Sequence, residues 1–195
     1  LRSLAVAHDE AYVYLRLETG AIDWARASYL IGIDTHGRTL GDALLPYTRT
    51  RVPTGLEFLL DLRGPEGSRL LVDEPYNLYR NPPIRGSNPL ATQQVSNRPF
   101  RSAANATARY DSLSVVTKRR RIGRDGTVYP AISHDRNLLL HARQQESSLA
   151  DWFADTLSGI IEVRIPWGML HVLDPSSQLV LRGDAKTGEN AGVPT

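Results

Sequence analysis

The sequence predicts an all-β protein: an antiparallel β-sandwich of the jelly-roll or immunoglobulin-like kind, with one long irregular loop and at most short helices. Two observations support this prediction. Eight or nine short segments rich in branched and aromatic residues are separated by turns of Gly, Pro and Asp. No convincing long helix interrupts them. At 195 residues, one domain spanning 1–195 is the expected organisation.

The first half of the chain contains four strand-like segments. The clearest is Ala11–Glu18, in which apolar and polar residues alternate with the period of a strand that has one buried face. A second segment covers Ser28–Thr35, where Gly32 marks a bulge or a close backbone approach. Two more, at 55–62 and 68–73, flank a short loop rich in Gly and Pro, which is typical of a hairpin.

The strand pattern fails over 76–112, where prolines interrupt a stretch of Asn, Ser and Arg. A loop of this length is unusual in a compact domain, and it is either functional or poorly ordered. Strand-like segments resume at Leu113, and Asp125-Gly126 predicts a hairpin turn. We expect one or two helical turns over 147–154, a final strand over 178–182 and a flexible tail over 184–195.

The stretch from Gly159 to Ser177 is the most informative. Three apolar residues, Ile161, Val163 and Ile165, alternate with charged ones, and Pro166 ends the predicted strand. The next residues form an apolar plug and then a turn; the plug consists of Trp167, Met169, Leu170 and Leu173, and the turn of Asp174-Pro175-Ser176-Ser177.

Together with 7–18 and 28–42, this stretch resembles the bacterial β-sandwich domains grouped with family 9 carbohydrate-binding modules and DOMON-type domains. The resemblance implies sugar binding, as in some members, or a structural or accessory role, as in others. It carries no catalytic signature, and we assign no catalytic residue.

Composition narrows the classes of partner. The formal charge of +2 is nearly balanced and does not call for nucleic acid, and the basic cluster 118–121 would divide between the two faces of a strand. No apolar run has the roughly 18 residues of a membrane-spanning helix, so we expect no span in this segment.

The chain begins almost within a strand pattern. We therefore interpret it as a domain cut from a larger bacterial envelope or secreted protein, which places it outside the cell or in the envelope.

Sugar recognition requires flat aromatic faces surrounded by planar polar groups. Aromatic residues in polar, irregular surroundings meet this need, and nearby amides and guanidinium groups supply donors. The predicted ligand-binding residues are Trp24, Tyr76, Asn77, Tyr79, Arg80, Arg101 and Trp152. The alternative is that each aromatic ring anchors its own loop to the sandwich.

Asp34 and Asp42 are candidate ligands of Ca²⁺, which prefers carboxylate and backbone oxygens, although solvent-exposed turn carboxylates are the simpler interpretation. No other cofactor is expected.

The leading hypothesis is a non-catalytic module that binds a polysaccharide or oligosaccharide and contacts the rest of its parent chain. The alternative is a protein-interaction or structural domain that packs against a neighbouring catalytic region. A glycan-active enzyme is third, because a glycosidase needs two carboxylates roughly 5–10 Å apart and Glu57, Asp61, Asp73 and Glu74 lie near the predicted hairpin.

Overall fold

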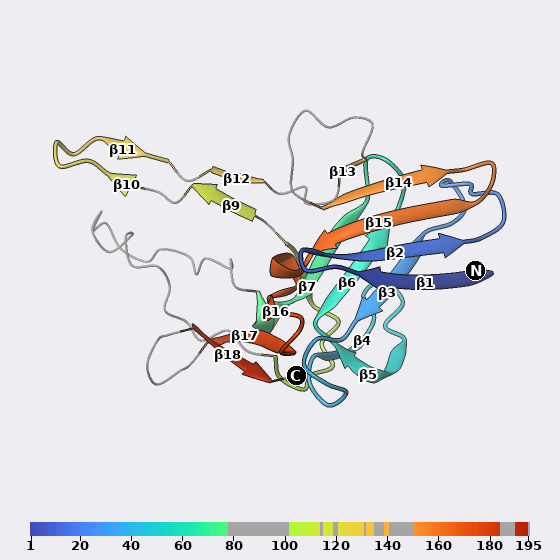
Figure 1. Ribbon diagram of the computed structural model, residues 1–195, viewed down its shortest axis with the longest axis horizontal. Helices are drawn as coiled ribbons and strands as arrows, with labels where there is room; N and C mark the ends of the chain where they lie inside the picture. The colour runs from blue at the N-terminus through green and yellow to red at the C-terminus, as the bar shows by residue number, and fades with distance from the viewer. Residues whose placement is uncertain are drawn as a thin grey trace.

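The computed structural model describes residues 1–77, 102–113, 115–118, 121–130, 132–134, 139–140, 150–183 and 190–194. These residues confirm the predicted all-β class, since strands dominate and helical structure is limited to short 3-10 turns. A five-stranded sheet and a four-stranded sheet face each other across a common core (Figure 1). No helix in this described part of the chain has the length and apolar character that a membrane crossing requires.

The larger sheet has the strand order β1-β2-β15-β14-β13. Its strands are β1 (Ser3–His8), β2 (Tyr12–Glu18), β15 (Ile160–Pro166), β14 (Asp151–Asp155) and β13 (Leu139–Leu140). All neighbours are antiparallel except β13 and β14, which are parallel. The predicted closing strand therefore lies in the middle of this sheet, between β2 and β14.

The smaller sheet has the order β3-β6-β7-β8, and all its pairs are antiparallel. Its strands are β3 (Tyr29–Ile33), β6 (Phe58–Leu62), β7 (Arg69–Asp73) and β8 (Tyr110–Ser112). The predicted hairpin is confirmed as β6 and β7. Gly32 in β3 lies where the side chain of Leu56 approaches, because an added Cβ would come within 2.6 Å of it. The close approach at Gly32 is thus made by a side chain and not, as predicted, by the backbone.

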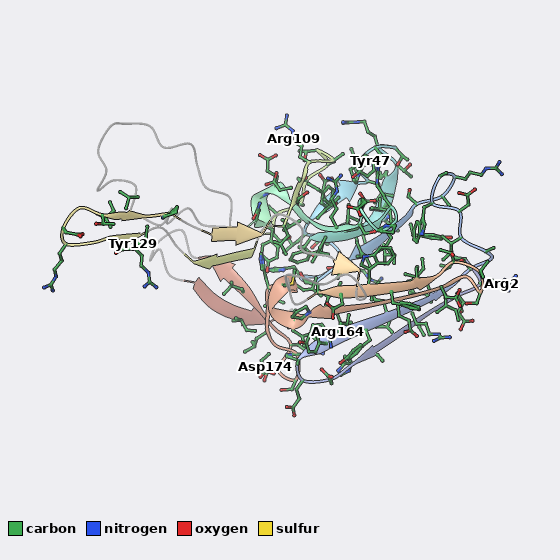
Figure 2. The ribbon with its side chains drawn as sticks, turned by 90° about the horizontal axis from the view of Figure 1, so that it is seen from above. Arg2, Tyr47, Arg109, Tyr129, Arg164 and Asp174 are labelled. Carbon is green, nitrogen blue, oxygen red and sulfur yellow. The ribbon has the colours of Figure 1, made fainter. Side chains whose placement is uncertain are left out.

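The core fills the space between the two sheets (Figure 2). The inward residues of β2 and β15 are the ones that the alternation indicated, and they pack against apolar residues of β6 and β7. The main contributors are Val13, Leu15, Leu17, Ile161, Val163, Ile165, Phe58, Leu60, Leu62, Leu70 and Val72.

The remaining elements are small. They are β4 (Asp42–Leu44), β5 (Arg51–Leu56), β9 (Val115–Lys118), β10 (Arg121–Ile122), β11 (Val128–Tyr129), β12 (Ile132–His134), β16 (Val172–Asp174), β17 (Leu179–Gly183), β18 (Asn190–Pro194) and the 3-10 turns η1 (Glu74–Tyr76) and η4 (Trp167–Leu170). The hairpin of β10 and β11 turns at Asp125-Gly126 as predicted, and it projects away from the two sheets (Figure 1).

Three local predictions are corrected. Where helical turns were expected over 147–154, Asp151–Asp155 forms strand β14, because five backbone pairings with β15 outweigh the local helical pattern. The expected tail over 184–195 contains β18, which pairs with β17 through Asn190–Pro194. Leu173, placed in the apolar plug, is exposed, whereas Met169 and Leu170 are buried there.

Candidate functional site

Two of the predicted sugar-binding aromatic residues belong to the core. Trp152 points inward from β14 with 1% of its surface exposed, and the ring of half-buried Trp24 meets it edge to face at 5.6 Å between centroids. Tyr76 is fully buried, and its Oη donates a hydrogen bond to the carbonyl of Leu181 at 2.7 Å. Burial between the sheets thus removes the ring faces of Trp152 and Tyr76 from solvent, which is the arrangement that the anchoring alternative describes.

Of the remaining predicted ligand-binding residues, the structure describes Asn77. Asn77 donates from Nδ2 to a carboxylate oxygen of Asp111 at 2.9 Å, which ties the end of η1 to β8. Tyr79, Arg80 and Arg101 lie outside the described residues. The long predicted loop of 76–112 falls largely in the same region, apart from its ends.

The two proposed calcium ligands have local roles. Asp34 accepts hydrogen bonds from the backbone N–H groups of His36 and Gly37, which closes the turn after β3. Asp42 is buried and accepts from Leu44 N and from both the N–H and the hydroxyl of Thr107. Among the described residues, no three His, Cys, Asp or Glu side chains converge as metal ligands.

Two buried carboxylates attach the segment 102–107 to the small sheet. Glu57 accepts from the hydroxyl of Ser102, and Asp73 accepts from Nδ2 of Asn105 at 2.9 Å. Burial raises the pKa of Glu57, and it raises the pKa of Asp73 to about 8. Both are fully buried, so their chemistry here is to hold a loop rather than to meet a substrate.

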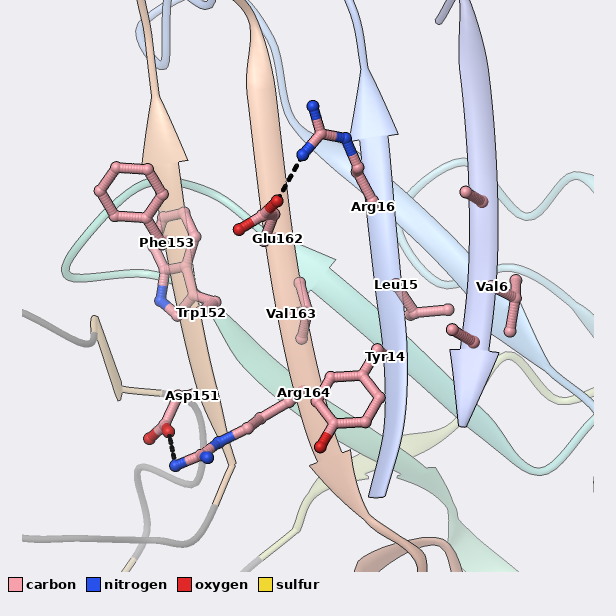
Figure 3. Close-up of a pocket in the computed structure, with 12 residues that line it drawn as sticks. Val6, Tyr14, Leu15, Arg16, Asp151, Trp152, Phe153, Glu162, Val163 and Arg164 are labelled. Atoms are coloured by element: carbon pink, nitrogen blue, oxygen red, sulfur yellow. Dashed lines mark hydrogen bonds and ion pairs between the residues drawn. The ribbon is translucent and has the colours of Figure 1, made fainter. Parts of the chain in front are cut away.

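An open groove lies on the outer face of the larger sheet (Figure 3). Its volume is about 600 Å³, within the range of about 300–1,000 Å³ typical of ligand sites. It crosses β1, β2, β15 and β14, and it is lined by Ala5, Val6, Ala7, Tyr14, Leu15, Arg16, Asp151, Trp152, Phe153, Glu162, Val163 and Arg164.

The strand register explains the shape of the groove. Because side chains alternate along a strand, the outward residues form rows across the sheet. One row pairs Ala5 with Arg16 and continues to Glu162 and Phe153. In each row the small alanine of β1 lies beside a long side chain of β2. The groove is therefore deepest over the short side chains of β1, and the longer side chains of the other strands form its walls.

Ion pairs fix the polar side chains of the groove. Arg16 lies between Glu162, at 2.6 Å, and Glu18, at 3.3 Å, and these hydrogen bonds raise the pKa of Arg16. Arg164 forms an ion pair with Asp151 on the neighbouring strand (Figure 3). Planar guanidinium and carboxylate groups therefore stand in fixed positions, which suits recognition of hydroxyl groups.

Two tyrosines on β2 are oriented by their neighbours. The Oη of Tyr14 donates to Asp9 at 2.7 Å, and Asp9 also accepts from the N–H groups of Ala11 and Tyr12. These bonds lower the pKa of Asp9 and raise that of Tyr14, so the phenol keeps its proton. The guanidinium of Arg164 lies 5.0 Å from the ring centroid of Tyr12. Phe153 adds a ring that is 46% exposed on the far side of the groove.

The sequence predictions missed this groove, although its outward residues were visible in the alternation. Tyr12, Tyr14 and Arg16 were placed on the polar face of their strand, as were Glu162 and Arg164. No local signal showed that β2 and β15, about 145 residues apart, are neighbours, since the register of Arg16 with Glu162 is a tertiary feature. Phe153 was hidden inside a predicted helical turn.

Comparison of the chain with protein-family models, with curated proteins and with solved structures found no match. The functional argument therefore rests on the geometry of the groove.

Proposed function

We propose that this chain is a non-catalytic carbohydrate-binding module that holds a glycan on the outer face of its larger sheet. The groove across β1, β2, β15 and β14 is the observation that supports this proposal. It is open to solvent on a rigid sheet, and it presents aromatic rings beside paired guanidinium and carboxylate groups. A sugar offers a C–H face to the rings and hydroxyl groups to the polar pairs.

The charge of the groove favours a neutral glycan. Its arginines, Arg16 and Arg164, are matched by the carboxylates of Glu18, Glu162 and Asp151. A negatively charged sugar would have to displace these carboxylates, whereas uncharged hydroxyl groups can use the remaining donors and acceptors of each pair. The groove spans three strand spacings, roughly 14 Å, which fits a short stretch of a polysaccharide chain.

Calorimetric titration with neutral and anionic oligosaccharides tests the proposal. Tyr14→Ala and Phe153→Ala should each weaken binding of the best neutral ligand roughly tenfold, because each removes an aromatic face. Two matched variants serve as controls: Tyr129→Ala on the projecting hairpin and Leu157→Ala in an exposed turn, both away from the groove.

The two controls should bind as the wild type does. Absence of binding to every glycan would overturn the proposal. So would binding that the control variants weaken as much as the groove variants do.

A second candidate function is protein interaction, and the hairpin of β10 and β11 favours it. Val128 and Tyr129 are both about half exposed on an arm that reaches away from the core (Figure 2). A photo-crosslinking residue at Tyr129, with one at Leu157 as the control, tests this in the producing cells. One protein captured from position 129 alone supports the function, and equal capture from both positions contradicts it.

A further inference from the structure

Strand β1 forms the outer edge of the larger sheet. It pairs with β2 on one side, and no strand of the described residues pairs with its other side (Figure 3). All six of its residues are exposed. An edge strand of this length carries a row of backbone groups that can pair with another strand.

The hydrogen-bond pattern identifies the outward groups. The N–H of Asp9 donates to the carbonyl of Tyr12 at 3.0 Å, which makes this pair a hydrogen-bonded one. Hydrogen-bonded and non-bonded pairs alternate along an antiparallel ladder. In the register of β1 with β2, the N–H and C=O groups of Leu4, Val6 and His8 therefore point away from β2.

The side chains of β1 do not protect this edge. The strand Ser3–His8 contains no Lys, Arg, Asp, Glu or Pro, which are the residues that usually prevent edge pairing. Leu4 and Val6 lie opposite the core residues Leu17 and Leu15 of β2, yet they are 46% and 63% exposed. Leu4 and Val6 thus form an uncovered apolar surface on the core-facing side of β1.

We propose that a second copy of this chain covers this edge by pairing its own β1 with β1 in the antiparallel direction. The charges at the ends of the strand are self-complementary. Arg2 precedes β1, and Asp9 and Glu10 follow it. Antiparallel pairing brings Arg2 of each copy beside the acidic turn of the other, whereas parallel pairing would bring like charges together.

The apolar residues also match under this symmetry. With the two-fold axis at Ala5, Leu4 of one copy stands opposite Val6 of the second copy, and both have outward backbone groups. The four side chains then form one apolar cluster on the core-facing side. The proposal stands without glycan binding. If the proposed function also holds, the two grooves adjoin across β1, because Ala5 and Ala7 line each of them.

Sedimentation velocity over a range of protein concentrations tests the dimer. The wild type should show a monomer–dimer equilibrium, and Val6→Lys should weaken association roughly tenfold or more, because it places a charge opposite the apolar Leu4 of the other copy and two like charges within the shared cluster. Val6→Pro removes an outward N–H without breaking a bond to β2, and it should have the same effect. Leu157→Lys is the matched control, since Leu157 is exposed in the turn between β14 and β15 and is not part of β1, and it should associate as the wild type does.

A charge exchange distinguishes a second copy from any other occupant. Arg2→Glu and Glu10→Arg should each weaken association, and the double variant should restore it, because only a self-pairing edge regains complementarity from the exchange. Circular dichroism checks that each variant is folded. A wild type that stays monomeric at millimolar concentration would overturn the proposal, and so would a dimer that the Val6 variants leave unchanged or a charge exchange without restoration.

Discussion

Asp73 is a carboxylic acid kept protonated near neutral pH by its surroundings. It is fully buried in β7, and burial together with the charges of Asp42 and Glu57 raises its pKa from 3.8 to about 8. In the unfolded chain the group titrates near its ordinary value. The native state therefore binds this proton more tightly, and that stabilisation is present below pH 4 and lost as the pH rises through about 8.

His171 shifts stability in the opposite direction. Burial lowers its pKa from 6.5 to about 3, so its contribution is present above pH 6.5 and lost as the pH falls. The two effects oppose each other below pH 6.5, and above it the effect of Asp73 remains.

The free energy of unfolding should therefore fall between pH 6.5 and 8.5, with Asp73 contributing at most about 1.4 kcal/mol per pH unit. Asp73→Asn keeps an acceptor for Asn105 and removes the titration, so it should flatten this slope and be more stable than the wild type at pH 8.5. Denaturant unfolding at several pH values measures this. Equal slopes for the two proteins would contradict the assignment to Asp73.

At the level of elements, the turn between β14 and β15 depends on one glycine. Gly159 has a φ of 74°, and a Cβ added there would lie 2.3 Å from the carbonyl oxygen of Gly20. The turn that joins β14 to β15 thus combines a left-handed backbone with a close approach to the end of β2.

Gly159→Ala should destabilise the protein by roughly 2 kcal/mol or more, since it adds backbone strain to a clash with a backbone atom. Gly20→Ala is the matched control, because nothing lies within 4 Å of its added Cβ. It should change stability by less than about 1 kcal/mol. Thermal melting of both variants tests the difference, and similar melting temperatures would count against this role for Gly159.

At the level of the whole molecule, stability resides in the two facing sheets and not in the projecting arm. The described residues of β10 and β11 add no member to the core. Lys118 pairs with Ile132 at the base of the arm, so a two-residue Asn-Gly turn can replace residues 119–131. This shortened chain should keep its melting temperature within a few degrees and retain glycan binding; a large drop would show that the arm supports the core.

The alternating sequences determined much of the fold. The inward residues of β2 and β15, the hairpin of β6 and β7 and the Asp-Gly turn of β10 and β11 all follow from local patterns, because alternation and turn chemistry act over a few residues. Tertiary pairing decided the rest. The pairings of Asp151–Asp155 with β15 made it a strand against its local pattern, and Trp152 was buried with it.

The sequence by itself thus determined that the chain is β-structured and which side of its best strands is buried. Only the tertiary structure decided where a ligand can bind, because the groove arises from outward residues of β1, β2, β14 and β15, whose register joins the two ends of the chain. A row of side chains across a sheet brings together residues that are far apart in the sequence, so no local stretch of sequence can predict it.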